Sequence, residues 1–101
     1  MAAARTVIAS FDAVAGREQE LADLLRWMAA RSRTEPGCGR YDLYRAESDG
    51  AVSYHIIEEY DDAAAIDAHR ASAHYKEYRS KVTGLIDGNV GVIVLTPVDV
   101  A

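Results

Sequence analysis

The spacing of apolar residues changes several times along the chain, and each change predicts a new element. Residues 6–11 are mostly β-branched or apolar and lead to a break at Ala15-Gly16, which predicts a first strand. From Arg17 to about Arg33 the apolar residues recur at helical spacing, which predicts a helix. Glu35-Pro36-Gly37 ends that helix, because proline cannot continue the backbone ladder and glycine permits a turn.

The middle of the chain predicts a hairpin and then more helix. Residues 40–44 and 52–60 alternate between polar and apolar on either side of a turn cluster, as the two strands of a hairpin do. Asp61-Asp62 offers an N-cap for a helix over residues 63–69, and Ser72 can cap a further helical stretch with an apolar stripe. We expect these two helical stretches to act as one kinked unit.

The last segment completes the fold prediction. Residues 90–98 are almost continuously apolar up to the region of Pro97, which predicts a final strand. The order β-α-β-β-α-β over residues 1–101 predicts one domain of the α+β class. Its expected form is the ferredoxin-like split βαβ sandwich, with a four-stranded antiparallel sheet and the helices on one face.

The last strand also bears on assembly, because both of its alternating sets are apolar and only one can face the helices. Val92 and Val94 belong to one set, and Ile93 and Leu95 to the other. Two sheets facing each other about a two-fold axis would cover the second set, which predicts a homodimer with a dimeric α+β barrel at its centre. The alternative is a monomer that tolerates the exposed face, although large apolar patches on monomers are rare.

Composition narrows the classes of partner. Half of the residues are apolar and the net charge is −5, with no basic run interleaved with aromatics, so we expect no nucleic-acid partner. No segment predicts a membrane span or a signal peptide, and the single cysteine, Cys38, cannot form an internal disulfide. These features favour a cytoplasmic protein.

Two histidines and a glutamate are the candidates for acid–base chemistry. His69 follows Ile66 by three residues and should face the sheet, as a general base or as a core-edge histidine bonded to backbone. Glu58 shares a strand face with Tyr54 and could work with His69 if burial raises its pKa, or could form a structural hydrogen bond. His74 could orient substrate or satisfy the corner between the helices. With no third ligand at a set spacing, we expect no metal.

The remaining candidates would bind substrate. Arg79 lies one residue beyond Tyr78 of the apolar stripe and could reach an anionic group, although most such arginines are solvated. Aromatic residues at strand and helix positions could stack on a flat substrate or belong to the core; they are Trp27, Tyr41, Tyr44, Tyr54 and Tyr78. No glycine pattern forms a phosphate cradle, so no nucleotide, flavin or other cofactor is expected.

Several segments together resemble the antibiotic biosynthesis monooxygenase family. They are Ala15-Gly16, Glu35-Pro36-Gly37-Cys38 with Arg40-Tyr41-Asp42, Glu58-Glu59-Tyr60, Ala68-His69, and Ala73-His74-Tyr75. The resemblance implies the fold predicted above and a cofactor-independent monooxygenase that oxidises a small aromatic polyphenol or hydroquinone with dioxygen. It also allows an isomerase or cyclase on the same scaffold, and a third hypothesis is a non-catalytic dimer that binds a small ligand.

The heme-degrading branch of that family has a pattern that this chain lacks. Such members resemble one another in an Asn on the first strand, a Trp on the second helix and a heme-ligating His on the next. Here residues 6–11 contain no Asn, His69 stands about where the Trp would be, and Arg79 stands about where the ligating His would be. We therefore do not expect heme cleavage.

Overall fold

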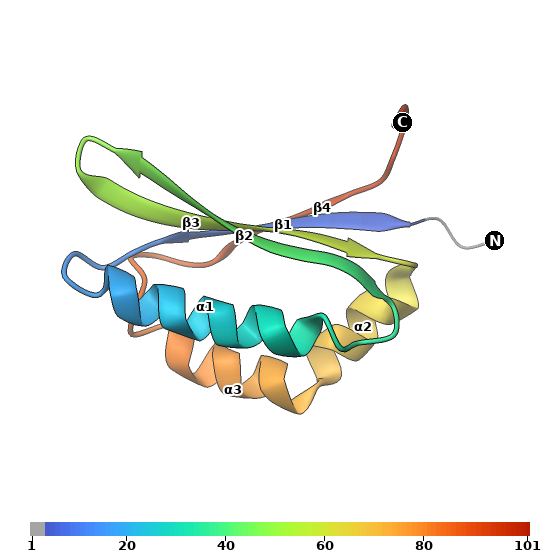
Figure 1. Cartoon of the computed structure of the whole chain (residues 1–101), viewed down its shortest axis with the longest axis horizontal. Coiled ribbons are helices and arrows are strands. Elements are labelled where there is room, and N and C mark those ends of the chain that lie inside the picture. The colour runs from blue at the N-terminus through green and yellow to red at the C-terminus, as the bar shows by residue number, and fades with distance from the viewer. Residues whose placement is uncertain (1–3) are drawn as a thin grey trace.

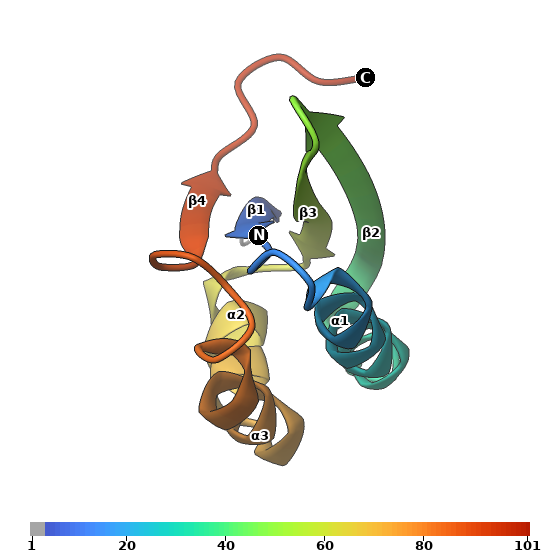
Figure 2. The ribbon, with the colours of Figure 1, turned by 90° about the vertical axis from the view of Figure 1, so that its left-hand side faces the viewer.

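The computed structural model describes residues 4–101 and shows the predicted α+β ferredoxin-like fold. Its elements in chain order are β1 (Arg5–Asp12), α1 (Glu18–Ser32), β2 (Cys38–Ser48), β3 (Ala51–Tyr60), α2 (Ala63–Ala71), α3 (Ala73–Val82) and β4 (Gly91–Leu95). The four strands form one antiparallel sheet in the order β2-β3-β1-β4. All three helices lie on one side of this sheet (Figures 1 and 2).

The core lies between the helices and the sheet. Alternate residues of β1 and β3 face it, so Phe11 and Ile56 are each only 1% exposed, and Leu21, Leu25 and Met28 of α1 are fully buried against them. The hairpin between β2 and β3 turns at Asp49-Gly50, where both residues have positive φ, as a tight hairpin turn requires.

The last strand is shorter than the predicted 90–98, and its ladder explains why. β4 pairs only with β1, from Ser10↔Gly91 to Thr6↔Leu95, so β1 offers almost no backbone beyond that point. Pro97 also lacks the N–H that a longer ladder would need. The chain from residue 96 onwards leaves the sheet and extends away from the helices (Figure 1).

The sheet face opposite the helices has an apolar centre. The strand registers place Ile8 beside Ile57 of β3 and Ile93 of β4, and the Ile93 side chain is 56% exposed. No helix between residues 4 and 101 is both long and apolar enough to cross a membrane.

Candidate active site

The candidate site is built where the loop after α1 meets the corner between α2 and α3. Gly37 permits that approach, since a Cβ at this position would lie 2.5 Å from the Cβ of Ala65 on α2. The Gly37 carbonyl also accepts a hydrogen bond from the Asp61 backbone N–H at 2.9 Å. These two contacts hold the loop against the start of α2 and so fix the position of Glu35, two residues before Gly37.

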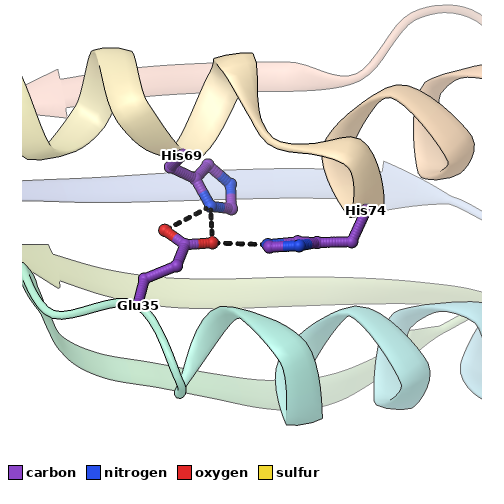
Figure 3. Close-up of side chains that lie close together, drawn as sticks. All are labelled: Glu35, His69 and His74. Atoms are coloured by element: carbon purple, nitrogen blue, oxygen red, sulfur yellow. Dashed lines mark hydrogen bonds and ion pairs between the residues drawn. The ribbon is translucent and has the colours of Figure 1, made fainter.

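Ser72 forms the break between α2 and α3 and sets the positions of the two histidines. Its backbone is extended, and its hydroxyl accepts from the Tyr75 backbone N–H as an N-cap while donating to the His69 carbonyl at 2.6 Å. This confirms the predicted kinked unit. Because the chain turns at Ser72, His69 from the end of α2 and His74 from the start of α3 both point towards Glu35 (Figure 3).

Glu35 contacts both histidines directly. The Nδ1 atom of His69 lies 3.1 and 2.9 Å from the two carboxylate oxygens, and Nε2 of His74 lies 2.5 Å from Oε2 (Figure 3). A carboxylate accepts only, so each of these ring nitrogens carries the hydrogen. His69 then holds its proton on Nδ1 when neutral, and its Nε2 has a free lone pair.

His69 is buried in an aromatic surrounding. Its exposed fraction is 4%, and its ring centroid lies 5.2 Å from Tyr75, 5.5 Å from Tyr60 and 5.8 Å from Tyr41. Burial lowers the pKa of His69, while the bond to Glu35 opposes this effect. The imidazole is therefore favoured in its neutral form, which is the form that can accept a proton.

A small cavity of about 40 Å³, which opens to solvent, lies beside this imidazole. Its walls come from the sheet, from α2 and α3, and from the segment at β4; they are Val7, Ala9, Tyr41, Glu58, Tyr60, Ile66, His69, Arg70, Tyr75, Tyr78, Arg79, Val90 and Val92. The lining is mainly apolar and aromatic with a few polar groups, as is typical of a small-molecule site.

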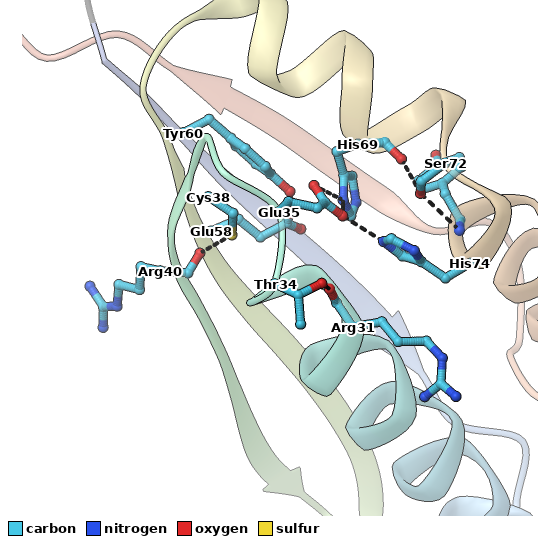
Figure 4. Close-up of polar contacts among 11 residues, drawn as sticks. Arg31, Thr34, Glu35, Cys38, Arg40, Glu58, Tyr60, His69, Ser72 and His74 are labelled. Atoms are coloured by element: carbon cyan, nitrogen blue, oxygen red, sulfur yellow. Dashed lines mark hydrogen bonds and ion pairs between the residues drawn. The ribbon is translucent and has the colours of Figure 1, made fainter.

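Glu58 is the carboxyl group of this cavity. It is 5% exposed and accepts a hydrogen bond of 2.5 Å from the Tyr60 hydroxyl (Figure 4). Burial raises the pKa of Glu58 to about 7, against the opposing effects of Tyr60 and Arg70. Near neutral pH much of this carboxyl is therefore protonated and able to donate a hydrogen bond.

Three tyrosines of the cavity keep protonated hydroxyls that can donate hydrogen bonds. Burial raises the pKa of Tyr41, Tyr60 and Tyr78 well above the usual range, so their hydroxyls stay protonated at neutral pH. Arg79 also lines the cavity and supplies a positive charge at its exposed side.

The structure gathers most of the predicted site residues but places three predicted aromatic residues elsewhere. His69, Glu58, Tyr41, Tyr78 and Arg79 line the cavity. His74 does not line it, but it bonds to Glu35, the partner of His69.

Tyr54 and Trp27 lie outside the cavity. The Tyr54 hydroxyl donates to the Glu18 carbonyl at 3.3 Å, at the far end of β3. The Trp27 ring of α1 is partly buried, with the Arg31 guanidinium 4.1 Å and the Lys81 ammonium group of α3 5.9 Å from its centroid. Tyr44, which the sequence placed with them, is 49% exposed on the face opposite the helices. Strand alternation places Tyr44 on the other face and helix rotation turns Trp27 away, whereas Tyr54 lies four residues from Glu58 along the same strand face.

Glu35 is the residue of the candidate site that the sequence did not predict. It was assigned only to the turn that ends the first helix. The expectation of no metal rested on the lack of a third ligand at a set spacing in the sequence. In the structure Glu35, His69 and His74 bring one ligand atom each to within 4.8 Å of one another. The signal available in the sequence was the carboxylate in a segment that resembles the family.

The fold and the site define a small ferredoxin-like α+β protein with a histidine, held by a carboxylate, beside an aromatic cavity. Comparison with known proteins then gives the family. Residues 4–81 match the antibiotic biosynthesis monooxygenase family, and the chain belongs to it.

Known relatives agree with this assignment. A Mycobacterium tuberculosis protein named "Putative monooxygenase Rv0793" is 39% identical over 95 residues, which are 94% of this chain and 92% of that protein. Its structure superposes with a TM-score of 0.89 and covers 97% of this chain and 98% of that one.

Two further structures are similar. PA3566 of Pseudomonas aeruginosa is 30% identical with a TM-score of 0.87, covering 98% of each chain. SO0527 of Shewanella oneidensis, at 24% identity and a TM-score of 0.86, covers 96% of this chain and 93% of that one and shows the shared fold. Together these findings support a monooxygenase-like role in general.

Proposed function

We propose that this chain is a cofactor-independent monooxygenase that oxidises a small hydroquinone or polyphenol with dioxygen, using His69 as its base. The observation that carries the proposal is the orientation of the His69 ring. Nδ1 donates to the Glu35 carboxylate, and the same ring lines an aromatic cavity, so Nε2 is the nitrogen left to accept a proton from a bound ligand.

The chemistry follows from the substrate. A phenol deprotonated by His69 becomes an electron-rich anion that can reduce dioxygen without a metal or a flavin. One oxygen atom enters the ring and the other leaves as water, so that a hydroquinone and dioxygen give a hydroxyquinone and water. The Glu35 carboxylate stabilises the imidazolium that forms during the proton transfer.

Other groups of the cavity would stabilise negative charge on oxygen. The protonated hydroxyls of Tyr41 and Tyr78 and the neutral carboxyl of Glu58 can donate hydrogen bonds, and Arg79 offers a positive charge. Buried apolar walls at Val7 and Ala9 lower the local polarity and strengthen these interactions.

A proton-transfer reaction without oxygen is the second candidate, and one observation favours it. His69 as a base and Glu58 as a neutral acid line the same cavity, which is the pairing that an isomerase or cyclase needs to move a proton next to a carbonyl. If the cavity only binds its ligand, the same groups serve recognition without turnover.

We also propose that two chains pair through the apolar sheet face and that the protein acts in the cytoplasm. The row of Ile8, Ile57 and Ile93 supports the first statement, because a second copy would cover it. The single Cys38 supports the second, since it cannot form an internal disulfide and nothing ties the fold to an oxidising compartment.

Oxygen uptake tests the proposed reaction. Metal-free protein is supplied with a panel of hydroquinones and polyphenols, and wild type is compared with His69→Ala. Uptake above spontaneous autoxidation that falls in the variant supports the monooxygenase and its base. Absence of uptake across the panel contradicts it and favours the isomerase or the binding protein, which a product assay with the same compounds separates.

A further inference from the structure

We propose that Glu35, His69 and His74 form a binding site for a divalent transition-metal ion, and that this ion switches off the base of the cavity. The site combines two imidazole nitrogens with one carboxylate oxygen, contributed by a loop and by two helices. Binding of the ion rests on this geometry alone. Its effect on activity rests in addition on the proposed function.

The geometry suits a metal. The three ligand atoms lie within 4.8 Å of one another, and both histidines already point at the same carboxylate (Figure 3). Ligands at the usual distance of about 2.0–2.2 Å from a zinc ion stand roughly 3.0–3.5 Å apart. Ligand atoms as far apart as 4.8 Å would have to close by roughly 1.3–1.8 Å. Shared between two side chains, this is a movement of under about 1 Å each, on the order of the thermal motion of a side chain.

The donor set selects the class of ion. Imidazole nitrogen favours zinc, copper, iron, cobalt and nickel, whereas calcium and magnesium require mostly oxygen ligands. Three protein ligands leave at least one further position for water, as in an open rather than a closed zinc site. The side chains of Glu35 and His74 are 16% and 18% exposed, so the site is shielded but reachable from solvent.

A bound metal and a working base exclude each other on His69. The ion would take the lone pair of Nδ1, so the single proton of the neutral ring would move to Nε2. That nitrogen would then donate into the cavity and could no longer accept the proton of a phenol. Glu35 would also be drawn to the metal and would cease to stabilise an imidazolium.

Zinc titration of chelator-treated protein tests the site. By calorimetry, wild type should bind one Zn²⁺ per chain, and Glu35→Gln and His74→Ala should each weaken binding at least tenfold. His55→Gln is the matched control, because His55 lies on the opposite sheet face between Ser10 and Ser53 and should leave binding unchanged. No binding by wild type, or equal binding by all variants, would overturn the proposal.

A second measurement uses wild-type protein only, so it tests the site even if the variants do not fold. In ¹⁵N spectra of the wild-type histidine rings, Zn²⁺ should shift the signals of His69 and His74 and leave those of His55 in place. Shifts confined to His55, or no shifts, would overturn the site.

Oxygen uptake then tests the switch. With an active substrate, Zn²⁺ should abolish uptake and a chelator should restore it, whereas undiminished uptake by zinc-loaded protein would refute the switch. If no substrate of the panel is oxidised, the proposed function has failed, while the calorimetry and the spectra still decide the metal site.

Discussion

The substitution Glu35→Gln isolates the part that the carboxylate plays in the candidate site. Glutamine has nearly the same shape and its carbonyl oxygen can still accept from His69 Nδ1, so the ring orientation is kept while the negative charge is lost. The bond from Glu35 raises the pKa of His69 against the lowering effect of burial. The variant should therefore hold a weaker base.

The size of the effect follows from the kind of bond. A hydrogen bond to a charged group contributes about 1.5–3 kcal/mol, and each 1.36 kcal/mol is a factor of ten in rate, so kcat/KM should fall roughly 10- to 150-fold. The acidic limb of the pH profile should also move to lower pH, because the pKa of the base has fallen.

The assay is oxygen uptake with the best substrate of the panel, measured from pH 5 to 9. Glu59→Gln is the matched control, since Glu59 has the same chemistry but lies on the opposite sheet face, bonded to Arg40. The ring ¹⁵N shifts of His69 report its tautomer independently. If Glu35→Gln left both kcat/KM and the pH profile as they are in wild type, the role given to Glu35 would be refuted.

Three further predictions concern stability and assembly. Burial raises the pKa of Glu58 to about 7, so the folded state keeps a proton that the unfolded state releases above about pH 4.3, and the stability of wild type falls as pH rises between these values. In urea melts, the stability of Glu58→Gln relative to wild type should therefore increase on the order of 2–3 kcal/mol between pH 5 and 8. A difference that does not change with pH would contradict the raised pKa. Gly37→Ala should lower the free energy of unfolding in urea melts by about 1–3 kcal/mol and weaken the Glu35 contact, because its Cβ meets Ala65. Gly39→Ala is the control and should cost less, since its Cβ would lie 3.9 Å from the nearest atom. Equal losses would contradict the close approach of Gly37 to α2. Ile93→Lys should give a monomer in sedimentation while Ala30→Lys on exposed helix surface stays dimeric, and a wild-type monomer would refute the dimer.

The sequence was sufficient for the architecture because its periodicities are local. Helix spacing from Arg17 onwards, the Asp49-Gly50 turn and the Ser72 cap each act within a few residues, and the structure confirms all three. The predicted end of the last strand, at residue 98, was wrong. The true end depends on where β1 stops offering backbone partners, which no local sequence pattern shows.

The site was only partly predictable for the same reason. His69 could be placed from Ile66 one turn earlier, and the structure confirms that it faces the sheet. Its partner Glu35 lies 34 residues away in sequence, and only the packing of the loop on α2 brings the two together. Trp27 failed as a cavity residue because helix periodicity does not say which neighbour a partly buried ring will meet.

The edge position of β4 has a consequence for how a ligand enters. Val92 and the preceding Val90 line the cavity, yet every residue of β4 is exposed and the strand has a single hydrogen-bonded neighbour. Such a strand opens locally at a lower free energy than the central strands, so its amides should exchange with deuterium faster than those of β1 and β3. Local opening of β4 would therefore give an aromatic ligand a route into the cavity, while the helices that hold His69 stay in place.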